Sequence, residues 1–269
     1  MRSFVSVAAF VALAATQFSG SAAPAAAEPD AALAKAIAGS QRTPALAARD
    51  PARHPAEELA FFGVKPTMTV VEIWPEGGYW TEILGSYLHD KGVYYAAEAS
   101  ATGKMADRYQ AKLDADKADY GNVKIVVFSK GHTDLVPPGT ADMVVTFRNL
   151  HNWMDEGWAE DAFAAFYKAL KPGGILGVED HRGRTDQPQD PAAKSGYVRQ
   201  DYAIALAEKA GFKLVGSSEI NANSKDTKDY PEGVWTLPPT LQLGDKDRAK
   251  YLAIGEADNF VLKFQKPER

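Results

Sequence analysis

The stretch that decides the fold is "VEIWPEGGYW", residues 71–80, which follows Thr69 and Val70. Residues 69–74 form an apolar, β-branched run that predicts a buried strand, and "YWTEILGSYLH" (79–89) has the apolar spacing of a helix. A strand that turns through glycines into a helix is the usual layout of a nucleotide-binding loop. Trp74 and Glu76, however, stand where such loops generally have glycine. The stretch therefore predicts an α/β fold with a cofactor loop of unusual composition.

The rest of the chain alternates strand-like runs with amphipathic helical runs. After residues 69–74, the strand-like runs lie at 92–99, 123–129, 141–147, 173–180, 212–220 and 259–266, and the helical runs at 79–89, 104–118, 158–170 and 195–211. Apolar strands separated by amphipathic helices predict a mainly parallel sheet covered on both faces. The last two strands have no helical pattern between them, which permits the final strand to insert antiparallel. We therefore predict an α/β, doubly wound, mainly parallel seven-stranded sheet.

The first residues have the features of a secretory signal peptide. Arg2 precedes an apolar run from Phe4 to Phe18, and small residues end in Ala25, Ala26 and Ala27. A membrane anchor is the alternative, but the run is shorter than the roughly 20 residues that a bilayer span needs. We predict cleavage of residues 1–27 and a periplasmic or secreted protein with no membrane attachment afterwards. No second arginine stands beside Arg2, so the chain is expected to cross the membrane unfolded and without a cofactor.

The composition limits the classes of partner. Removal of residues 1–27 from the 269-residue chain leaves 242 residues and takes away only Arg2 among 30 basic residues, so 29 basic side chains stand against 35 acidic ones. A mildly acidic chain without a run of Lys and Arg gives no electrostatic reason to bind nucleic acid, so a small-molecule substrate is expected. The absence of cysteine excludes a disulfide framework, a lipoprotein anchor and thiolate metal sites.

Three segments follow the signal peptide in the predicted organisation. Residues 28–53, rich in alanine and proline, are expected to form an N-terminal arm outside the core, with a helical piece at 30–38. Residues 54–269 are expected to form the main domain, and its first helix, "HPAEELAFFGV", is expected to end at Gly63. Residues 221–256 separate the last two strands by more than a hairpin needs, which predicts a cap or lid.

Four sequence blocks carry a resemblance to a known family. They are the "VVEIWPEGGYWTEIL" block, "FRNLHNW" (147–153), "LKPGGILGVEDHR" (170–182) and "SEINANSKDTKDYPEGVWTLPPTL" (218–241). Over residues 55–267 the chain resembles class I S-adenosylmethionine-dependent methyltransferases, and more narrowly an exported bacterial family called predicted methyltransferases. The resemblance implies the methyltransferase fold for residues 54–269 and S-adenosylmethionine as the cofactor.

The resemblance also implies a set of cofactor residues. Glu72 corresponds to the acid of the first strand, and Glu98, at the tip of the second, to the acid that accepts the ribose hydroxyls. The other cofactor residues that it implies are Trp74, Gly77, Gly78 and Asn149. A carboxylate at Glu76 either repels the cofactor's methionine carboxylate or lies harmlessly in water on the rim. An acid often marks the adenine pocket at the end of the third strand in this fold, but Asp134 comes several residues late, so the adenine contact stays unassigned.

The candidate catalytic residues follow the fourth and fifth strands. The carboxyl edge of a doubly wound sheet is where ligands bind, and both "FRNLHNW" and "VEDHR" lie there. His151 is the best candidate base because its unperturbed pKa is near neutrality, and Asp180 and His181 are expected beside it. A hydrogen-bonding role in the loop is the alternative for His151, and strand-end salt bridges are the alternative for the second motif. No HxH or HxxxH spacing is present, so no metal site is expected.

Further polar and aromatic residues are expected to bind the acceptor. They are Arg148, Asn152, Trp153, Arg182, Tyr230 and Trp235. The two aromatic residues of the cap, Tyr230 and Trp235, either line a substrate pocket or hold the cap to the core.

The sequence thus favours an S-adenosylmethionine-dependent methyltransferase that acts on an unidentified small molecule in the cell envelope. The alternative is a non-catalytic envelope binding protein on the same scaffold, because the cofactor is made in the cytoplasm and the loop is altered. A hydrolase is disfavoured, since the chain has neither a G-x-S-x-G motif nor a cysteine nucleophile.

Overall fold

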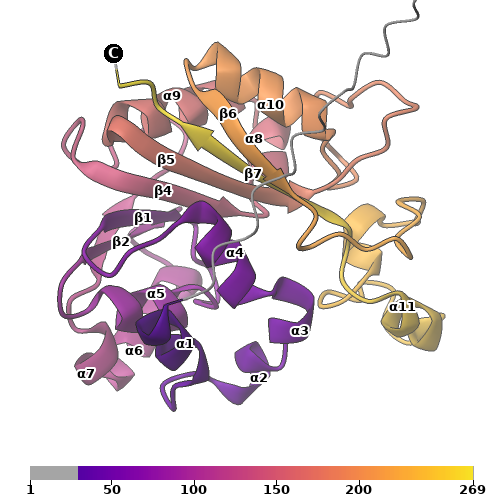
Figure 1. Ribbon diagram of the computed structural model, residues 1–269. Helices are drawn as coiled ribbons and strands as arrows, with labels where there is room; N and C mark the ends of the chain where they lie inside the picture. Colours follow the sequence, from indigo (N-terminus) through magenta and orange to yellow (C-terminus); the bar gives the residue numbers. More distant parts are fainter. Residues whose placement is uncertain (1–29, 269) are drawn as a thin grey trace, which may run out of the picture.

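The computed structural model describes residues 30–268 (Figure 1). The predicted signal peptide, residues 1–27, lies outside the described residues. Within them, no helix is long and apolar enough to cross a membrane.

The described chain contains the predicted seven-stranded sheet. The strands are β1 (Thr69–Ile73), β2 (Val93–Glu98), β3 (Lys124–Val127), β4 (Ala141–Phe147), β5 (Leu170–His181), β6 (Lys213–Ser218) and β7 (Asn259–Gln265). Their spatial order is β3-β2-β1-β4-β5-β7-β6, and β7 runs antiparallel to both of its neighbours. The expected insertion of the final strand is therefore confirmed.

Helices cover both faces of the sheet. They are α4 (Pro55–Phe62), α5 (Thr81–Leu88), α6 (Lys104–Ala115) and α7 (Lys117–Tyr120), and then α8 (Leu150–Asp155), α9 (Ala159–Ala169) and α10 (Gln200–Lys209). Side chains of β1 alternate between the two faces, as a strand requires: Val71 and Ile73 join the core with α8 to α10, and Val70 joins the core with α4 and α5. Both faces of the central strands are therefore buried.

Two predicted helices have different bounds for local reasons. The run 104–118 divides at Asp116, whose carboxylate accepts a hydrogen bond from the backbone N–H of Asp119 and so begins a new helix. The run 195–211 becomes helical only at Gln200, because Gly196 has a φ of 76° and Arg199 is extended. In contrast, α4 ends at Phe62 with Gly63 in the left-handed region, as predicted.

The N-terminal arm was expected outside the core, and this expectation is wrong. It forms α1 (Ala31–Ala38), α2 (Pro44–Ala47) and α3 (Asp50–Arg53). Leu33 and Ala36 of α1 are buried in the core with α5. Tyr87 of α5 also donates a hydrogen bond to Asp30, the N-cap of α1, so both apolar packing and a polar contact hold α1 against the domain.

The segment 221–256 forms a small cap with its own apolar cluster. It holds the 3₁₀ helix η1 (Gly233–Thr236) and α11 (Arg248–Ile254). Val234, Leu237 and Tyr251 pack together there with Tyr197. Figure 1 shows α2, α3 and the cap on the side toward which β4 and β5 point, so all three border the carboxyl edge of the sheet.

Candidate functional site

The loop after β1 has an unusual backbone conformation. Trp74, Glu76 and Gly78 have φ values of 50°, 49° and 77°, in the left-handed region. This region is costly for residues with a Cβ and often marks functional sites. A Cβ added at Gly77 would meet no atom within 4 Å among the described residues, so the backbone there faces open space. Glu76 is exposed, which fits the hypothesis that its carboxylate lies on the rim in water.

The indole of Trp74 turns toward the end of β3. Its Nε1 donates a hydrogen bond to the backbone carbonyl of Phe128 at 2.8 Å. Its ring contacts Trp153 edge-on, with centroids 5.7 Å apart, and lies 6.0 Å from the ring of Trp158. The indole therefore lies at the carboxyl end of β3, where the sequence analysis looked for the adenine contact.

Glu72 is buried and its carboxylate is already hydrogen-bonded. Tyr94 Oη donates to Glu72 Oε2, and the hydroxyl groups of Tyr94 and Tyr109 both contact Thr81 Oγ1. Burial raises the pKa of Glu72 to about 8, although the bond from Tyr94 opposes this. Glu72 therefore ties β1 to β2 and to the start of α5, and it also forms part of the wall of a small cavity under the loop.

Glu98 lies at the tip of β2, as predicted, and has unused hydrogen-bonding capacity. Its side chain is 6% exposed, and Oε1 has no hydrogen-bond partner within residues 30–268. Burial and the nearby charge of Glu76 raise its pKa to about 7. A buried carboxylate oxygen without a donor is costly, and the hydroxyl groups of a ribose would satisfy it.

His151 and Asp180 form a hydrogen-bonded pair. His151 Nδ1 lies 2.9 Å from Asp180 Oδ1, and the backbone N–H of His151 donates to Asp180 Oδ2 at 3.1 Å. Burial alone would lower the pKa of His151, but the charge and hydrogen bond of Asp180 outweigh it, and the pKa is raised. Since Asp180 holds Nδ1, the opposite nitrogen, Nε2, is left for a ligand. Asp180 thus positions His151.

His181 lies beside His151 in a fixed tautomer. Asn259 donates from Nδ2 to Glu179 Oε1 at 3.0 Å, so its Oδ1 accepts from His181 Nδ1 at 2.7 Å. Burial lowers the pKa of His181 to about 3, so the ring is neutral and offers Nε2 as an acceptor. The two imidazole centroids are 5.4 Å apart.

These histidines open into the larger of two adjoining cavities. The larger, of about 250 Å³, is lined by Arg49, Arg53, Glu76, Phe147, Arg148, His151, Asn152, His181, Val234, Trp235, Pro238, Pro239 and Thr240. The smaller, of about 80 Å³, lies under the loop after β1 and shares Arg49, Arg53, Glu76 and Phe147 with it. Together they lie just above the lower end of the range for small-molecule pockets, about 300–1,000 Å³.

Four predicted site residues have other roles. Asn149 Nδ2 donates to the carbonyl of Ile73 at 2.8 Å and so ties β4 to β1. Trp153 is fully buried in the core, so its assignment to substrate binding is wrong. Arg182 pairs with Glu219 at 2.7 Å rather than lining the cavity, and Tyr230 packs edge-on against Tyr251 within the cap. Their positions on the correct loops did not decide where their side chains point.

Asp134 is also excluded as the adenine contact. It is exposed, and its carboxylate pairs with Lys168 at 2.7 Å. The indole of Trp74 occupies the end of β3 instead.

Sequence reasoning missed three charged residues of the site. Arg49 and Arg53 come from the arm around α3, and Glu256 comes from the end of the cap. The available signal was the segment "ARDPARHP" (48–55), which places two arginines four residues apart, each two residues before a proline. Nothing in the local pattern showed that the arm would return to the sheet edge.

The histidine pair has partial features of a metal site. One nitrogen of each of His151 and His181 and one oxygen of Asp180 lie within 4.8 Å of one another. The residues come from α8 and β5, so no sequence spacing could reveal the cluster. Asp180 already accepts hydrogen bonds from the backbone N–H groups of His151 and His181 and from the His151 ring. Asp180 is therefore satisfied by hydrogen bonds within the chain.

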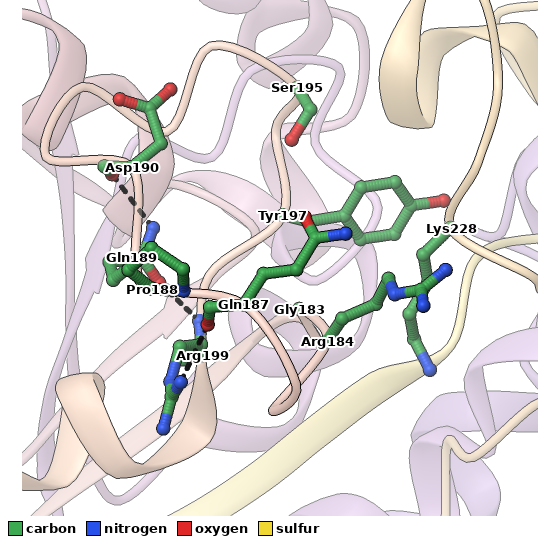
Figure 2. Close-up of a pocket in the computed structure, with 10 residues that line it drawn as sticks. All are labelled: Gly183, Arg184, Gln187, Pro188, Gln189, Asp190, Ser195, Tyr197, Arg199 and Lys228. Carbon is green, nitrogen blue, oxygen red and sulfur yellow. Dashed lines mark hydrogen bonds between the residues drawn. The ribbon is translucent and has the colours of Figure 1, made fainter.

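A separate cavity of about 110 Å³ lies in the loop after β5 (Figure 2). Its cations are all paired: Arg184 with Asp186 at 2.6 Å, Lys228 with Asp258 at 2.8 Å, and Arg199 with Asp201. Arg199 also donates to the carbonyls of Thr185 and Gln187, which holds the loop together. These paired charges make the cavity a less suitable ligand site than the one around His151.

Comparison with solved structures identifies the fold. A SAM-dependent methyltransferase from Aquifex aeolicus is similar over 81% of this chain and 93% of its own, with a TM-score of 0.57 and 17% identity. The chain has the class I methyltransferase fold. An arsenic(III) S-adenosylmethionine methyltransferase from Chlamydomonas reinhardtii, CrArsM, is similar over 90% of this chain and 74% of its own, with a TM-score of 0.53 and 15% identity.

The same fold also carries other chemistry. The [4+2]-cyclase SpnF is similar over 76% of each chain, with a TM-score of 0.52 and 13% identity. No family model and no curated protein matches this chain. The methyltransferase fold is therefore shown, and the reaction has to be argued from the site.

Proposed function

We propose that the protein is an S-adenosylmethionine-dependent methyltransferase that acts on a small molecule in the cell envelope. The observation that carries the proposal is the position of the His151–Asp180 pair, which opens into a cavity adjoining the loop after β1. The envelope location rests on the signal peptide predicted for residues 1–27.

The residues around the loop fit most of the cofactor. Glu98 offers its unpartnered oxygen to the ribose hydroxyls, and the open space above Gly77 suits close approach of the amino-acid portion. Trp74 stands at the nucleobase end, so its indole has to leave the carbonyl of Phe128 before the whole cofactor can bind. When bound, S-adenosylmethionine supplies an electrophilic methyl group.

The chain itself supplies proton transfer and orientation. His151 takes the proton of the acceptor's nucleophile at Nε2, because Asp180 fixes its Nδ1 and stabilises the imidazolium that forms. Neutral His181 accepts a second hydrogen bond from the acceptor at its own Nε2. The half-buried Trp235 lies edge-on to His151, with centroids 5.9 Å apart, and helps to exclude water from the base.

Cofactor binding tests this proposal without knowledge of the acceptor. Calorimetric titration of S-adenosylhomocysteine into residues 28–269 is expected to show binding that Glu98→Gln weakens at least about tenfold, because a charge-assisted hydrogen bond is lost. A matched control is Glu57→Gln, at an exposed position in the first turn of α4, which should leave the affinity unchanged. Equal affinities for the native protein and Glu98→Gln would remove the ribose assignment.

The indole of Trp74 favours a second candidate, a non-catalytic envelope binding protein. If the indole never leaves the end of β3, the cavity around His151 binds a ligand and transfers nothing. Absence of S-adenosylhomocysteine binding to the native protein, together with binding to Trp74→Ala, would support this candidate over methyl transfer.

A further inference from the structure

Two arginines of the N-terminal arm and one that follows β4 meet at one carboxylate. Arg49 donates to Glu256 from Nε and a terminal nitrogen, at 2.8 and 2.9 Å, and Arg148 reaches it at 2.5 Å. Arg53 Nε lies 4.0 Å from the same carboxylate. The arm, the end of β4 and the end of the cap are therefore joined at the wall of the larger cavity.

The acids that face these arginines do not balance their charge. Glu256 is ionised, since the arginines lower its pKa to about 2 against the effect of burial, and Glu179 contacts Arg148 at 3.2 Å. Glu58 is fully buried, and burial together with the charge of Glu179 raises its pKa well above the usual value. Its carboxylate accepts a hydrogen bond from Asn221 and forms no ion pair with an arginine within residues 30–268. Three permanent cations thus meet two carboxylates.

The other charged groups of this wall do not supply the missing negative charge. Glu76 lines the cavity, but within residues 30–268 it forms no ion pair with these arginines, and its carboxylate is exposed to water. Asp180 is held by His151 and by backbone N–H groups. The positive charge at the arginines is therefore left for a ligand to neutralise.

Arg53 shows this imbalance most directly. Its side chain is buried, and Nε has no hydrogen-bond partner within residues 30–268. Burial and the neighbouring charges of Arg148 and Arg49 lower its pKa to about 10, so it is still a cation at neutral pH. A buried guanidinium donor without an acceptor is costly unless a ligand completes it.

Part of the remaining wall of the cavity is apolar. Phe147, Val234, Trp235 and the pair Pro238–Pro239 line it, beside the polar side chains of Asn152 and Thr240. An apolar patch next to a charged end suits a small organic anion better than a free inorganic ion.

We propose that this cavity is the acceptor subsite for a small organic anion, a carboxylate or a phosphate ester. Arg49, Arg53 and Arg148 bind its charged group, and its apolar body lies against Trp235. The nucleophile of the same molecule then faces His151. As an assignment of the methyl acceptor, this inference rests on the proposed function, but the binding of an anion is a separate property of the chain.

The test uses simple probes without any cofactor. Benzoate and phenyl phosphate are titrated into residues 28–269 by calorimetry, with benzamide as a neutral control of similar shape. At least one anion is expected to bind, and benzamide is expected to bind at least about tenfold more weakly, because the charge-assisted bonds are absent. Failure of both anions to bind would overturn the proposal, and so would equal binding of benzamide.

Matched variants identify the residues that bind the anion. Arg53→Gln and Arg49→Gln should each weaken anion binding about tenfold, whereas Arg108→Gln, at an exposed position on α6, removes the same charge without effect. Arg49 is the less buried of the two, with 22% of its side chain exposed, so Arg49→Gln keeps the test valid if Arg53→Gln does not fold. An equal effect of Arg108→Gln would mean that net charge alone attracts the anion, which contradicts the proposed site.

A second pair of ligands tests whether the arginines bind the acceptor or the carboxylate of the cofactor. S-adenosylhomocysteine carries a carboxylate, and 5′-methylthioadenosine lacks the amino-acid portion. If Arg53→Gln weakens only S-adenosylhomocysteine and leaves benzoate and phenyl phosphate unchanged, the arginines serve the cofactor and the proposal fails. If the anions bind and S-adenosylhomocysteine does not, the result supports the anion site and contradicts the proposed methyl transfer.

Discussion

Replacement of Trp74 by alanine should make the protein less stable, and the variant should bind an S-adenosyl compound more tightly. The substitution removes the hydrogen bond to the carbonyl of Phe128 and the contacts with Trp153 and Trp158. A hydrogen bond of this kind contributes about 1 kcal/mol, and each aromatic pair about 0.5–1.5 kcal/mol. The free energy of unfolding should therefore fall by about 2–4 kcal/mol.

The free energy of these indole interactions also sets an upper limit on the gain in affinity for S-adenosylhomocysteine. In the native protein, a nucleobase that enters at the end of β3 first has to displace the indole and lose these interactions. Removal of that cost corresponds to a gain of at most roughly 30- to 1,000-fold. Because the alanine variant also loses an aromatic surface that the nucleobase would contact, we expect the lower half of this range.

The assay combines guanidinium unfolding with calorimetric titration of S-adenosylhomocysteine. Phe163→Leu is the control, since Phe163 packs on Phe166 in the same core, with ring centroids 5.6 Å apart, whereas the ring contacts of Trp74 are with Trp153 and Trp158. It should lower stability without a change in affinity. If Trp74→Ala is less stable but binds S-adenosylhomocysteine no better than the native protein, the indole does not occupy the nucleobase position.

Three further predictions concern the chemistry of the site. His151→Gln should lower turnover at least about 100-fold and leave the affinity for S-adenosylhomocysteine unchanged; a parallel loss of affinity or stability would mark a structural role. Because the base must be neutral and Asp180 raises its pKa, the acid limb of the pH–rate profile should lie above pH 6.5 and move to lower pH in Asp180→Asn; an unmoved limb would contradict the pairing. Glu76→Gly should lower the pKa of Glu98 from about 7, so S-adenosylhomocysteine binding at pH 6 should improve more than binding at pH 8; equal changes at both pH values would argue against Glu98 as the ribose acceptor.

The sheet could be predicted from the sequence because its central strands are buried on both faces. Runs such as residues 141–147 are mostly apolar, and the runs between them have the pattern of helices, so the number of strands did not require distant information. The sequence allowed an antiparallel final strand but did not place it between β5 and β6. Glu98 and His151 were found for the same reason: each follows a strand whose carboxyl end lies at the ligand-binding edge.

The charged part of the site could not be predicted because it depends on contacts far apart in the chain. Arg49 and Glu256 are 207 residues apart, and neither lies at the end of a strand. The predicted substrate-binding roles of Trp153 and Arg182 were wrong for the converse reason. They lie on the correct loops, but packing in the core and pairing with Glu219 decide where their side chains point.

The cap also differs from the simple lid that its length suggested. Asn221 Nδ2 donates to Glu58 at 2.7 Å and to Glu179 at 3.1 Å, so the start of the segment is tied into the buried acids. Removal of residues 221–256 would therefore disturb the core. Trp235→Ala is the cleaner perturbation: it should raise the KM for the acceptor and leave S-adenosylhomocysteine affinity unchanged, and the reverse order would refute the acceptor-side assignment of the cap.

The most direct test of the account is a crystal structure of residues 28–269 grown with S-adenosylhomocysteine. If the protein is a methyltransferase, we expect the ribose hydroxyls to contact Glu98 and the amino-acid portion to lie above Gly77. We also expect the indole of Trp74 to be turned away from the carbonyl of Phe128. A ligand bound elsewhere, or crystals in which the Trp74–Phe128 hydrogen bond persists and the ligand does not bind at saturating concentration, would contradict the proposed methyl transfer.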